Sequence, residues 1–193
     1  QNNLSASTVE QSFRDSFFTT ISIITTTGYG TADFNLWAPF TWIMILILML
    51  IGGSAGSTAG GIKSIRVLLM IKYSYNEFKR IIHPNAVVPL RYNKIMVKET
   101  TITRVLAFCL LYMLLVAIGA VVLAFSGMGF VESLSGMITC LSDVGPGLGE
   151  IGPANNFANI PLFSKWFLSI VMLIGRLELF TVLLLFTPVF WKK

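Results

Sequence analysis

A long apolar run, Val105 to Phe125, constrains the fold more than any other feature of the sequence. Its length matches the roughly 20 residues that a helix needs to cross a bilayer. Inside lipid a backbone has to satisfy its own hydrogen bonds, so this run is expected to be a membrane-spanning helix. Apolar residues make up 54% of the chain and charged residues only 12%, which excludes an ordinary soluble domain. The sequence therefore predicts an integral membrane protein.

The other apolar stretches fall into two length classes. Two are too short to cross about 30 Å of hydrocarbon, and we expect them to be half-helices that enter the membrane and return. They run from Phe13 to Thr26 and from Phe130 to Leu141. Two longer stretches are predicted to span the membrane. One begins with Trp37 to Ile51 and resumes from Ile62 to Tyr73, and the other runs from Trp166 to Phe190. Each is expected to be interrupted near its middle.

Basic residues are unevenly distributed along the chain. Nine of the 14 Lys and Arg residues lie between Lys63 and Arg104, and none lies between Gly127 and Ser164. Positive residues concentrate in the cytoplasmic loops of membrane proteins. The segment from Glu77 to Glu99 is therefore predicted to be a cytoplasmic connection, and the loop from Asn155 to Phe163 is predicted to lie outside. This topology explains the basic segment more simply than nucleic-acid binding does.

Each half-helix is followed by a glycine-rich segment. The first glycine loop, Thr25 to Thr31, reads Thr-Thr-Thr-Gly-Tyr-Gly-Thr, and the second, Asp143 to Gly149, reads Asp-Val-Gly-Pro-Gly-Leu-Gly. Glycine adopts backbone angles that are closed to other residues and can turn successive carbonyl oxygens to one side. Carbonyl oxygens replace the water shell of the ion in potassium pores. One such loop alone is more simply a turn between helices, but two in matching positions indicate a repeated unit.

The glycine loops supply the candidate ion-binding groups. The half-helices would point their negative C-terminal ends toward a cation. Asp143 would either add negative charge near the ion or accept hydrogen bonds from backbone amides, and we favour the second role. The filter carbonyls are expected to be those of Thr27, Gly28, Tyr29, Val144, Gly145 and Pro146, with potassium at Thr27, Gly28, Val144 and Gly145.

A run of small residues interrupts the span that begins at Trp37. We call it the small-residue loop. Non-helical backbone at membrane depth is tolerated only where protein buries it or where it lines a watery cavity. The run is therefore a candidate gate, although close packing between helices also explains small residues, and the two roles are compatible. Its members are Gly52, Gly53, Ser54, Ala55, Gly56, Ser57, Thr58, Ala59, Gly60 and Gly61.

Arg176 is the second candidate gate residue. It lies in the middle of the predicted span from Trp166 to Phe190, where a cation is costly and faces protein or a cavity. Glu178 is two positions away, so on one helix the two side chains would point to different faces. Arg176 would either form a buried ion pair with another helix or place a positive charge below the filter that opposes a passing cation. We favour the second role.

Two enzyme-like patterns have weaker support. Gly52 to Gly56 matches the G-x-S-x-G pattern of serine hydrolases, but the only histidine that could act as a base is His83, at the far end of the basic segment. Gly56 to Ser64 nearly matches a nucleotide-binding P-loop, yet Ile62 occupies the position of the required lysine. A structural or regulatory membrane subunit without conduction of its own remains the alternative to a transporter.

Four segments resemble one family closely. They are Thr25–Thr31, Gly52–Lys63, Asp143–Gly149 and Gly175–Thr181. Together they are similar to the second half of bacterial Trk-type potassium uptake subunits (TrkH or TrkG), which belong to the Trk/Ktr/HKT superfamily. The resemblance covers essentially the whole chain. It supports the role of Arg176, since members of the family place an arginine near the constriction of the pathway.

The resemblance implies an all-α membrane protein of the pore-loop class found in the potassium-channel superfamily. Each repeat of that class runs helix, half-helix, filter, helix. Residues 1–93 would be a third repeat that lacks its first span, with half-helix, filter, broken inner helix and cytoplasmic loop. Residues 94–193 would be a fourth repeat with span, half-helix, filter and span. The chain begins at Gln1 with no visible signal peptide, so we expect it to be part of a longer polypeptide whose N-terminal half completes the filter.

The implied function is potassium uptake across the bacterial inner membrane by selective permeation, in a multi-pass transporter rather than an enzyme. Potassium would be the bound ion, with no organic cofactor in this chain. The implied partners are membrane lipid, a second copy of the subunit and a cytosolic nucleotide-binding regulatory ring of the TrkA type. Proton coupling, as in a symporter, and sodium permeation are left open. Residues that could meet the ring, or instead face water or lipid, are Lys79, Arg80, His83 and Arg91.

Overall fold

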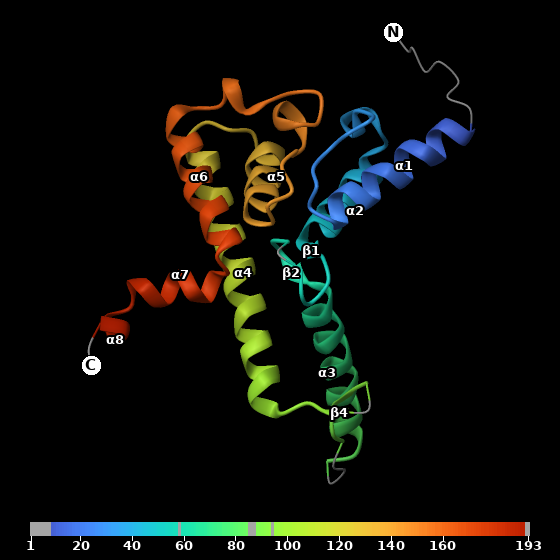
Figure 1. Ribbon diagram of the computed structural model, residues 1–193, viewed down its shortest axis with the longest axis vertical. Coiled ribbons are helices and arrows are strands. Elements are labelled where there is room, and N and C mark those ends of the chain that lie inside the picture. The colour runs from blue at the N-terminus through green and yellow to red at the C-terminus, as the bar shows by residue number, and fades with distance from the viewer. Residues whose placement is uncertain (1–8, 58, 85–87, 94, 192–193) are drawn as a thin grey trace.

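A computed structural model describes residues 9–191, apart from residues 58, 85–87 and 94 (Figure 1). The described chain is mostly helical, as predicted, and its strands form two short pairs. The elements in chain order are α1 (Val9–Ile24), η1 (Phe34–Leu36), α2 (Pro39–Leu50), β1 (Ile51–Gly52), β2 (Ile62–Lys63), α3 (Ser64–Ile82), β3 (Arg91–Tyr92), β4 (Ile95–Met96), α4 (Glu99–Phe125), α5 (Phe130–Leu141), η2 (Gly149–Ile151), η3 (Phe157–Asn159), α6 (Leu162–Arg176), α7 (Leu179–Phe186) and α8 (Pro188–Trp191).

The short helix α5 lies at the centre of the main packed region. It packs against α4, α6 and α2, and every residue from Ser135 to Leu141 is buried. Apolar and small residues all round a helix suit it to be enclosed on every side. Gly119 on α4 leaves room for the Met137 side chain, because a Cβ at Gly119 would collide with it. A helix with the predicted ends, Phe130 and Leu141, is confirmed.

Helix α4 carries the predicted spanning segment. Its 27 residues give a length of about 40 Å at 1.5 Å per residue. Among the described residues it is the one helix long and apolar enough to cross a membrane, and the bent pair α6–α7 makes a second if counted as one span. Leu110 and Val121 are about two-thirds exposed on its surface, which suits contact with lipid. The helix begins at Glu99, before the predicted start at Val105.

Helix α3 is longer than the sequence pattern indicated. The prediction ended this helix at Tyr73 and made Glu77 to Glu99 a connection, but the helix continues to Ile82. Glu77 and Arg80, one turn apart, form an ion pair of 3.4 Å that supports the last turns. The rest of the connection contains the β3–β4 hairpin. A small cluster of Leu69, Leu90 and Ile102 packs α3 against the start of α4.

The predicted span from Trp166 to Phe190 is not one helix. Helix α6 ends at Arg176 and α7 starts at Leu179, with an angle of 110° between them. Glu178 at the break has φ of 63°, a left-handed conformation that a continuing helix does not contain. Figure 1 shows α7 running sideways, away from the packed helices α4 to α6. Arg176 is therefore the last residue of α6, at the break, and not the middle of one continuous helix.

Candidate functional site

The first glycine loop folds back onto the end of α1. The Thr27 N–H donates to the Ser22 carbonyl oxygen at 2.9 Å, and the Ser22 hydroxyl donates to the Tyr29 carbonyl oxygen at 2.6 Å. Thr26 and Gly28 have φ of 53° and 77°. Two left-handed residues, separated by one residue, turn the chain sharply at the C-terminal end of the half-helix.

The second glycine loop folds onto α5 in the same way. The Val144 N–H donates to the Thr139 carbonyl oxygen at 3.0 Å, and the Thr139 hydroxyl donates to the Pro146 carbonyl oxygen at 3.0 Å. Asp143 and Gly145 have φ of 55° and 118°. The same hydroxyl also accepts the Gly145 N–H at 3.0 Å, a contact that the first loop lacks among its described hydrogen bonds.

The two loops therefore match position by position. Gly28 corresponds to Gly145 in its positive φ, and the hydroxyl bond from Ser22 to Tyr29 corresponds to that from Thr139 to Pro146. The sequence showed only the glycine pattern. The paired hydroxyls were missed, because a serine or threonine in an apolar helix gives no sign of its partner.

The glycine loops lie against each other. A Cβ at Gly28 would collide with the Val144 carbonyl oxygen and stand 3.3 Å from the Pro146 ring. A Cβ added at Gly145, in contrast, would have no described atom within 4 Å. Tyr29 is 72% exposed. The two loops therefore contact each other at Gly28 and Val144, whereas Gly145 and Tyr29 lie on an open side.

Asn35 joins the chain after the first glycine loop to the end of the second. Its side-chain amide donates to the Gly149 carbonyl oxygen at 3.1 Å and accepts the Gly149 N–H at 3.0 Å. Because two hydrogen bonds join the same side chain to the same residue, they fix both the distance and the orientation of Gly149 relative to Asn35. Nothing in the local sequence around Asn35 pointed to this contact.

The small-residue loop is non-helical throughout its described residues; Thr58 lies outside them. Strands β1 and β2 pair in parallel at its two ends, so the chain leaves and returns at the same place. Close pairing is possible because Gly52 has no side chain, and a Cβ there would collide with the Gly60 carbonyl oxygen. The sequence prediction of a broken helix is correct for this stretch.

Three elements meet at Asp143. A Cβ on Gly60 would collide with the Ser142 carbonyl oxygen and lie 2.9 Å from the Asp143 Oδ2 atom, and a Cβ on Gly175 would lie 3.4 Å from the same atom. The small-residue loop and α6 therefore both pack against the start of the second glycine loop. Oδ2 is buried and accepts no hydrogen bond within the described part of the chain. Arg176 attracts the Asp143 carboxylate electrostatically.

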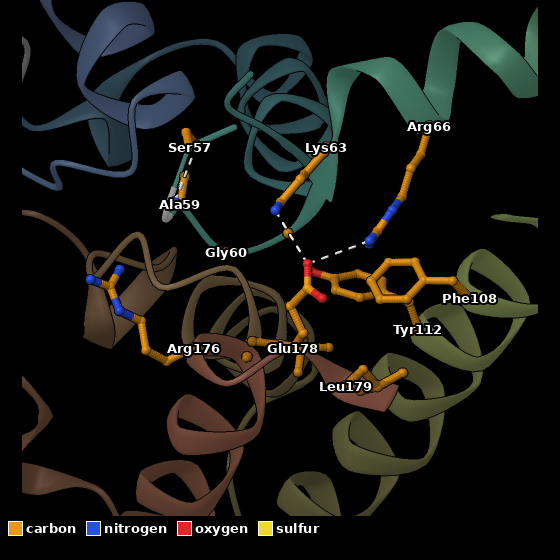
Figure 2. A pocket seen from close by; sticks show the side chains of 13 residues that line it. Ser57, Ala59, Gly60, Lys63, Arg66, Phe108, Tyr112, Arg176, Glu178 and Leu179 are labelled. Atoms are coloured by element: carbon orange, nitrogen blue, oxygen red, sulfur yellow. Dashed lines mark hydrogen bonds and ion pairs between the residues drawn. The ribbon is translucent and has the colours of Figure 1, made fainter. Parts of the chain in front are cut away.

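Glu178 connects the α6–α7 break to the start of α3. Its Oε1 atom lies 3.2 Å from the Lys63 Nζ atom and 3.5 Å from the Arg66 guanidinium. The Arg66 guanidinium also lies over the Phe108 ring, 3.9 Å from its centroid. In Figure 2, Arg176 points away from Glu178, on the opposite side of the cavity.

The placement of Glu178 refines one sequence inference. The sequence placed Arg176 and Glu178 on different faces of one helix, but Glu178 lies outside both helices. Its pairing with Lys63 and Arg66 was missed, because more than a hundred positions separate the partners in the sequence. The cavity between these groups has a volume of about 260 Å³.

The hydrolase pattern has no histidine near its serine. Ser54 follows β1 at the start of the small-residue loop, whereas His83 caps the far end of α3. The 19 residues of α3 separate the two ends of that helix by roughly 28 Å. The only histidine in the sequence therefore lies too far away to activate Ser54.

Comparisons with known proteins point to one family. The family model TrkH, described as "Cation transport protein", matches residues 2–193. The potassium uptake protein TrkI of Halomonas elongata is 40% identical over 91% of this chain and 36% of its own length. TrkH of Escherichia coli K12 is 37% identical over 92% of this chain and 36% of its own length. The crystal structure of the potassium transporter TrkH from Vibrio parahaemolyticus matches 97% of this chain and 40% of that chain, with a TM-score of 0.89 and 37% identity.

Proposed function

Because the chain belongs to the TrkH family of cation transport proteins, we propose that it forms part of a potassium uptake pathway in the bacterial inner membrane. The observation that carries this proposal is the pair of glycine loops, which share one hydrogen-bond scheme and lie against each other. The chain spans about 36% of the length of the curated relatives it matches. Transport is therefore proposed for the whole polypeptide that contains this chain.

The ion would be held by backbone carbonyl oxygens of the two glycine loops. Those of Thr27, Gly28, Val144 and Gly145 are the proposed potassium ligands. The Tyr29 and Pro146 carbonyls already accept a hydroxyl hydrogen bond each, which leaves one lone pair for an ion. Helices α1 and α5 end at the loops, so their C-terminal partial negative charges would favour a cation there.

The small-residue loop and Arg176 would control passage below the filter. This proposal is supported by the close approach of Gly60 to Ser142 and by the position of Arg176 at the end of α6, near Asp143. A loop held by packing and by one β1–β2 pairing can move without unfolding a helix. Arg176 would add a Coulomb barrier to any cation that leaves the filter.

The remaining parts of the transporter are proposed by likeness to the family. Two further pore-loop repeats, from an N-terminal half of the same polypeptide, would complete the filter on its open side. A homodimer in lipid and a cytosolic nucleotide-binding ring of the TrkA type would complete the assembly. Lys79, Arg80, His83 and Arg91 lie toward the end of α3 and in the hairpin after it, and are the proposed contacts of that ring.

A matched pair of glycine variants tests the filter. Gly145 has φ of 118° and Gly127 has φ of 98°. A Cβ added at either position would have no described atom within 4 Å. Alanine at either position therefore costs similar backbone strain, but only Gly145 lies in a glycine loop. In the full polypeptide, Gly145→Ala should lower the ratio of potassium to sodium uptake in vesicles, whereas Gly127→Ala should not. An unchanged ratio in Gly145→Ala, with normal potassium uptake, would remove this loop from the filter. No potassium uptake by the unaltered protein would favour a structural or regulatory subunit.

A further inference from the structure

Ser22 and Thr139 make hydrogen bonds that are unusual for hydroxyls inside helices. A helical serine or threonine commonly donates to the carbonyl oxygen four residues earlier. On α1, Ser16 and Thr20 do so, each at 2.8 Å. Ser22 and Thr139 instead donate forward, to the carbonyl oxygens of Tyr29 and Pro146, seven residues later.

Both side chains are enclosed, and both act twice on the same loop. Ser22 is 5% exposed and Thr139 is fully buried. The backbone carbonyl of each also accepts an N–H from its loop, from Thr27 in one case and Val144 in the other. Each residue therefore holds its glycine loop at two points, one on either side of the central glycine.

We infer that Ser22 and Thr139 are positioning residues for ion selectivity. The inference rests on the proposed filter. Each hydroxyl fixes the peptide group that follows Tyr29 or Pro146 and so limits rotation of the neighbouring carbonyls that would bind the ion. Discrimination between potassium and the smaller sodium ion depends on how the coordinating carbonyls are arranged and held. Loss of the hydroxyl lets the loop contract around sodium.

The two hydroxyls differ in the number of hydrogen bonds that they make to their loops. The Thr139 hydroxyl donates to Pro146 and accepts from Gly145, whereas the Ser22 hydroxyl makes one described bond within its loop. Removing the Thr139 hydroxyl takes a partner from two backbone groups of its loop, the Pro146 carbonyl and the Gly145 N–H, whereas removing the Ser22 hydroxyl takes one from the Tyr29 carbonyl. The second glycine loop should therefore be the more sensitive of the two.

The test compares potassium and sodium uptake by the full polypeptide in vesicles. Ser22→Ala should lower the potassium-to-sodium ratio about fivefold, the factor equivalent to about 1 kcal/mol, the net worth of one hydrogen bond. Thr139→Val, which keeps the side-chain shape, should lower the ratio further. Thr139→Ser keeps the hydroxyl and should retain the ratio. Ser133→Ala removes a buried hydroxyl at the opposite end of α5 and should also retain it.

The outcomes separate this inference from the filter proposal. If Gly145→Ala changes the ratio while Ser22→Ala and Thr139→Val do not, the positioning role is wrong and the filter stands. If all three leave the ratio unchanged, the filter itself is wrong. If Thr139→Val fails to accumulate in the membrane, Ser22→Ala decides, because it loses only one described loop bond. A ratio lowered equally by Ser133→Ala would mean general destabilisation and would overturn the inference.

Discussion

Gly60 in the small-residue loop lies against Ser142 and Asp143, where the second glycine loop begins. A Cβ there would collide with the Ser142 carbonyl oxygen, whereas a Cβ at Gly56, in the same loop, meets no described atom within 4 Å. Gly60→Ala should therefore push the loop away from the filter, at a cost of about 1–3 kcal/mol. Faster potassium uptake with an unchanged potassium-to-sodium ratio is expected, and Gly56→Ala is the control. Equal uptake rates in the two variants would show that the loop does not limit flux.

Arg176 leads to a second prediction at the scale of one residue. Two unit charges 4 Å apart interact by about 4 kcal/mol at an effective dielectric constant of about 20. Water in the pathway reduces this value, and each 1.4 kcal/mol corresponds to about tenfold in rate. Arg176→Ala should speed potassium uptake without changing ion preference, and Arg176→Lys should stay near the unaltered rate.

The attraction between Arg176 and Asp143 defines the opposing outcome for that experiment. If the arginine mainly neutralises Asp143, Arg176→Ala leaves the buried Oδ2 atom of Asp143 without its compensating charge, which destabilises the protein. Transport and the thermal unfolding midpoint would then fall together. Adding Asp143→Asn to Arg176→Ala should restore the midpoint in that case, because the second change removes the unpaired charge.

Among the elements, the break between α6 and α7 is tied to the start of α3 by charge. Glu178 pairs with Lys63 and Arg66, and about half of its side chain is exposed. Exposed ion pairs contribute roughly 0–1 kcal/mol each, so Glu178→Gln should lower the unfolding midpoint only slightly. Since β2 ends at Lys63, the loss should free the small-residue loop at that end and raise basal potassium uptake. Glu10→Gln, which breaks the exposed Arg14–Glu10 pair on α1, is the control.

A charge exchange makes the Glu178 prediction specific. In an Arg66→Gln background, which removes the cation 3.5 Å from the Glu178 carboxylate, Lys63→Glu combined with Glu178→Lys restores opposite charges at the same two positions. Uptake should return toward the unaltered rate in the double variant and stay raised in Glu178→Gln. If the double variant behaves like Glu178→Gln, position 178 acts through its strained backbone, with φ of 63°, and not through the pair.

The same elements show what the sequence could predict. The ends of α5 and the non-helical small-residue loop were predicted correctly because glycines mark them locally. An interruption near the middle of this span was predicted, but not the sharp bend between α6 and α7, because Leu177 and Glu178 interrupt an apolar run without proline, and distant partners hold Glu178 in place. Ser22, Thr139 and Asn35 were missed for a related reason, since their roles depend on where the chain returns in space.

At the scale of the molecule, α4 connects a segment rich in basic residues to a segment that has none. The segment before it carries most of the basic residues, and the chain from Gly127 to Ser164 carries none. A helix of about 40 Å crosses a bilayer with a few residues to spare at each end. The exposed residues Ser74, on α3, and Ala154, after η2, therefore lie on opposite sides of the membrane if the basic segment is cytoplasmic.

Cysteine labelling tests this topology with little background from the chain, because both of its own cysteines, Cys109 and Cys140, are buried. In the full polypeptide, Ala154→Cys should react with a membrane-impermeant thiol reagent in intact cells. Ser74→Cys should react only after the membrane is permeabilised, because a charged reagent cannot cross the hydrocarbon to reach α3. The unaltered protein supplies the baseline. Labelling of both variants in intact cells would mean that α4 does not separate the two surfaces, and the reverse pattern would mean that the basic segment faces outward.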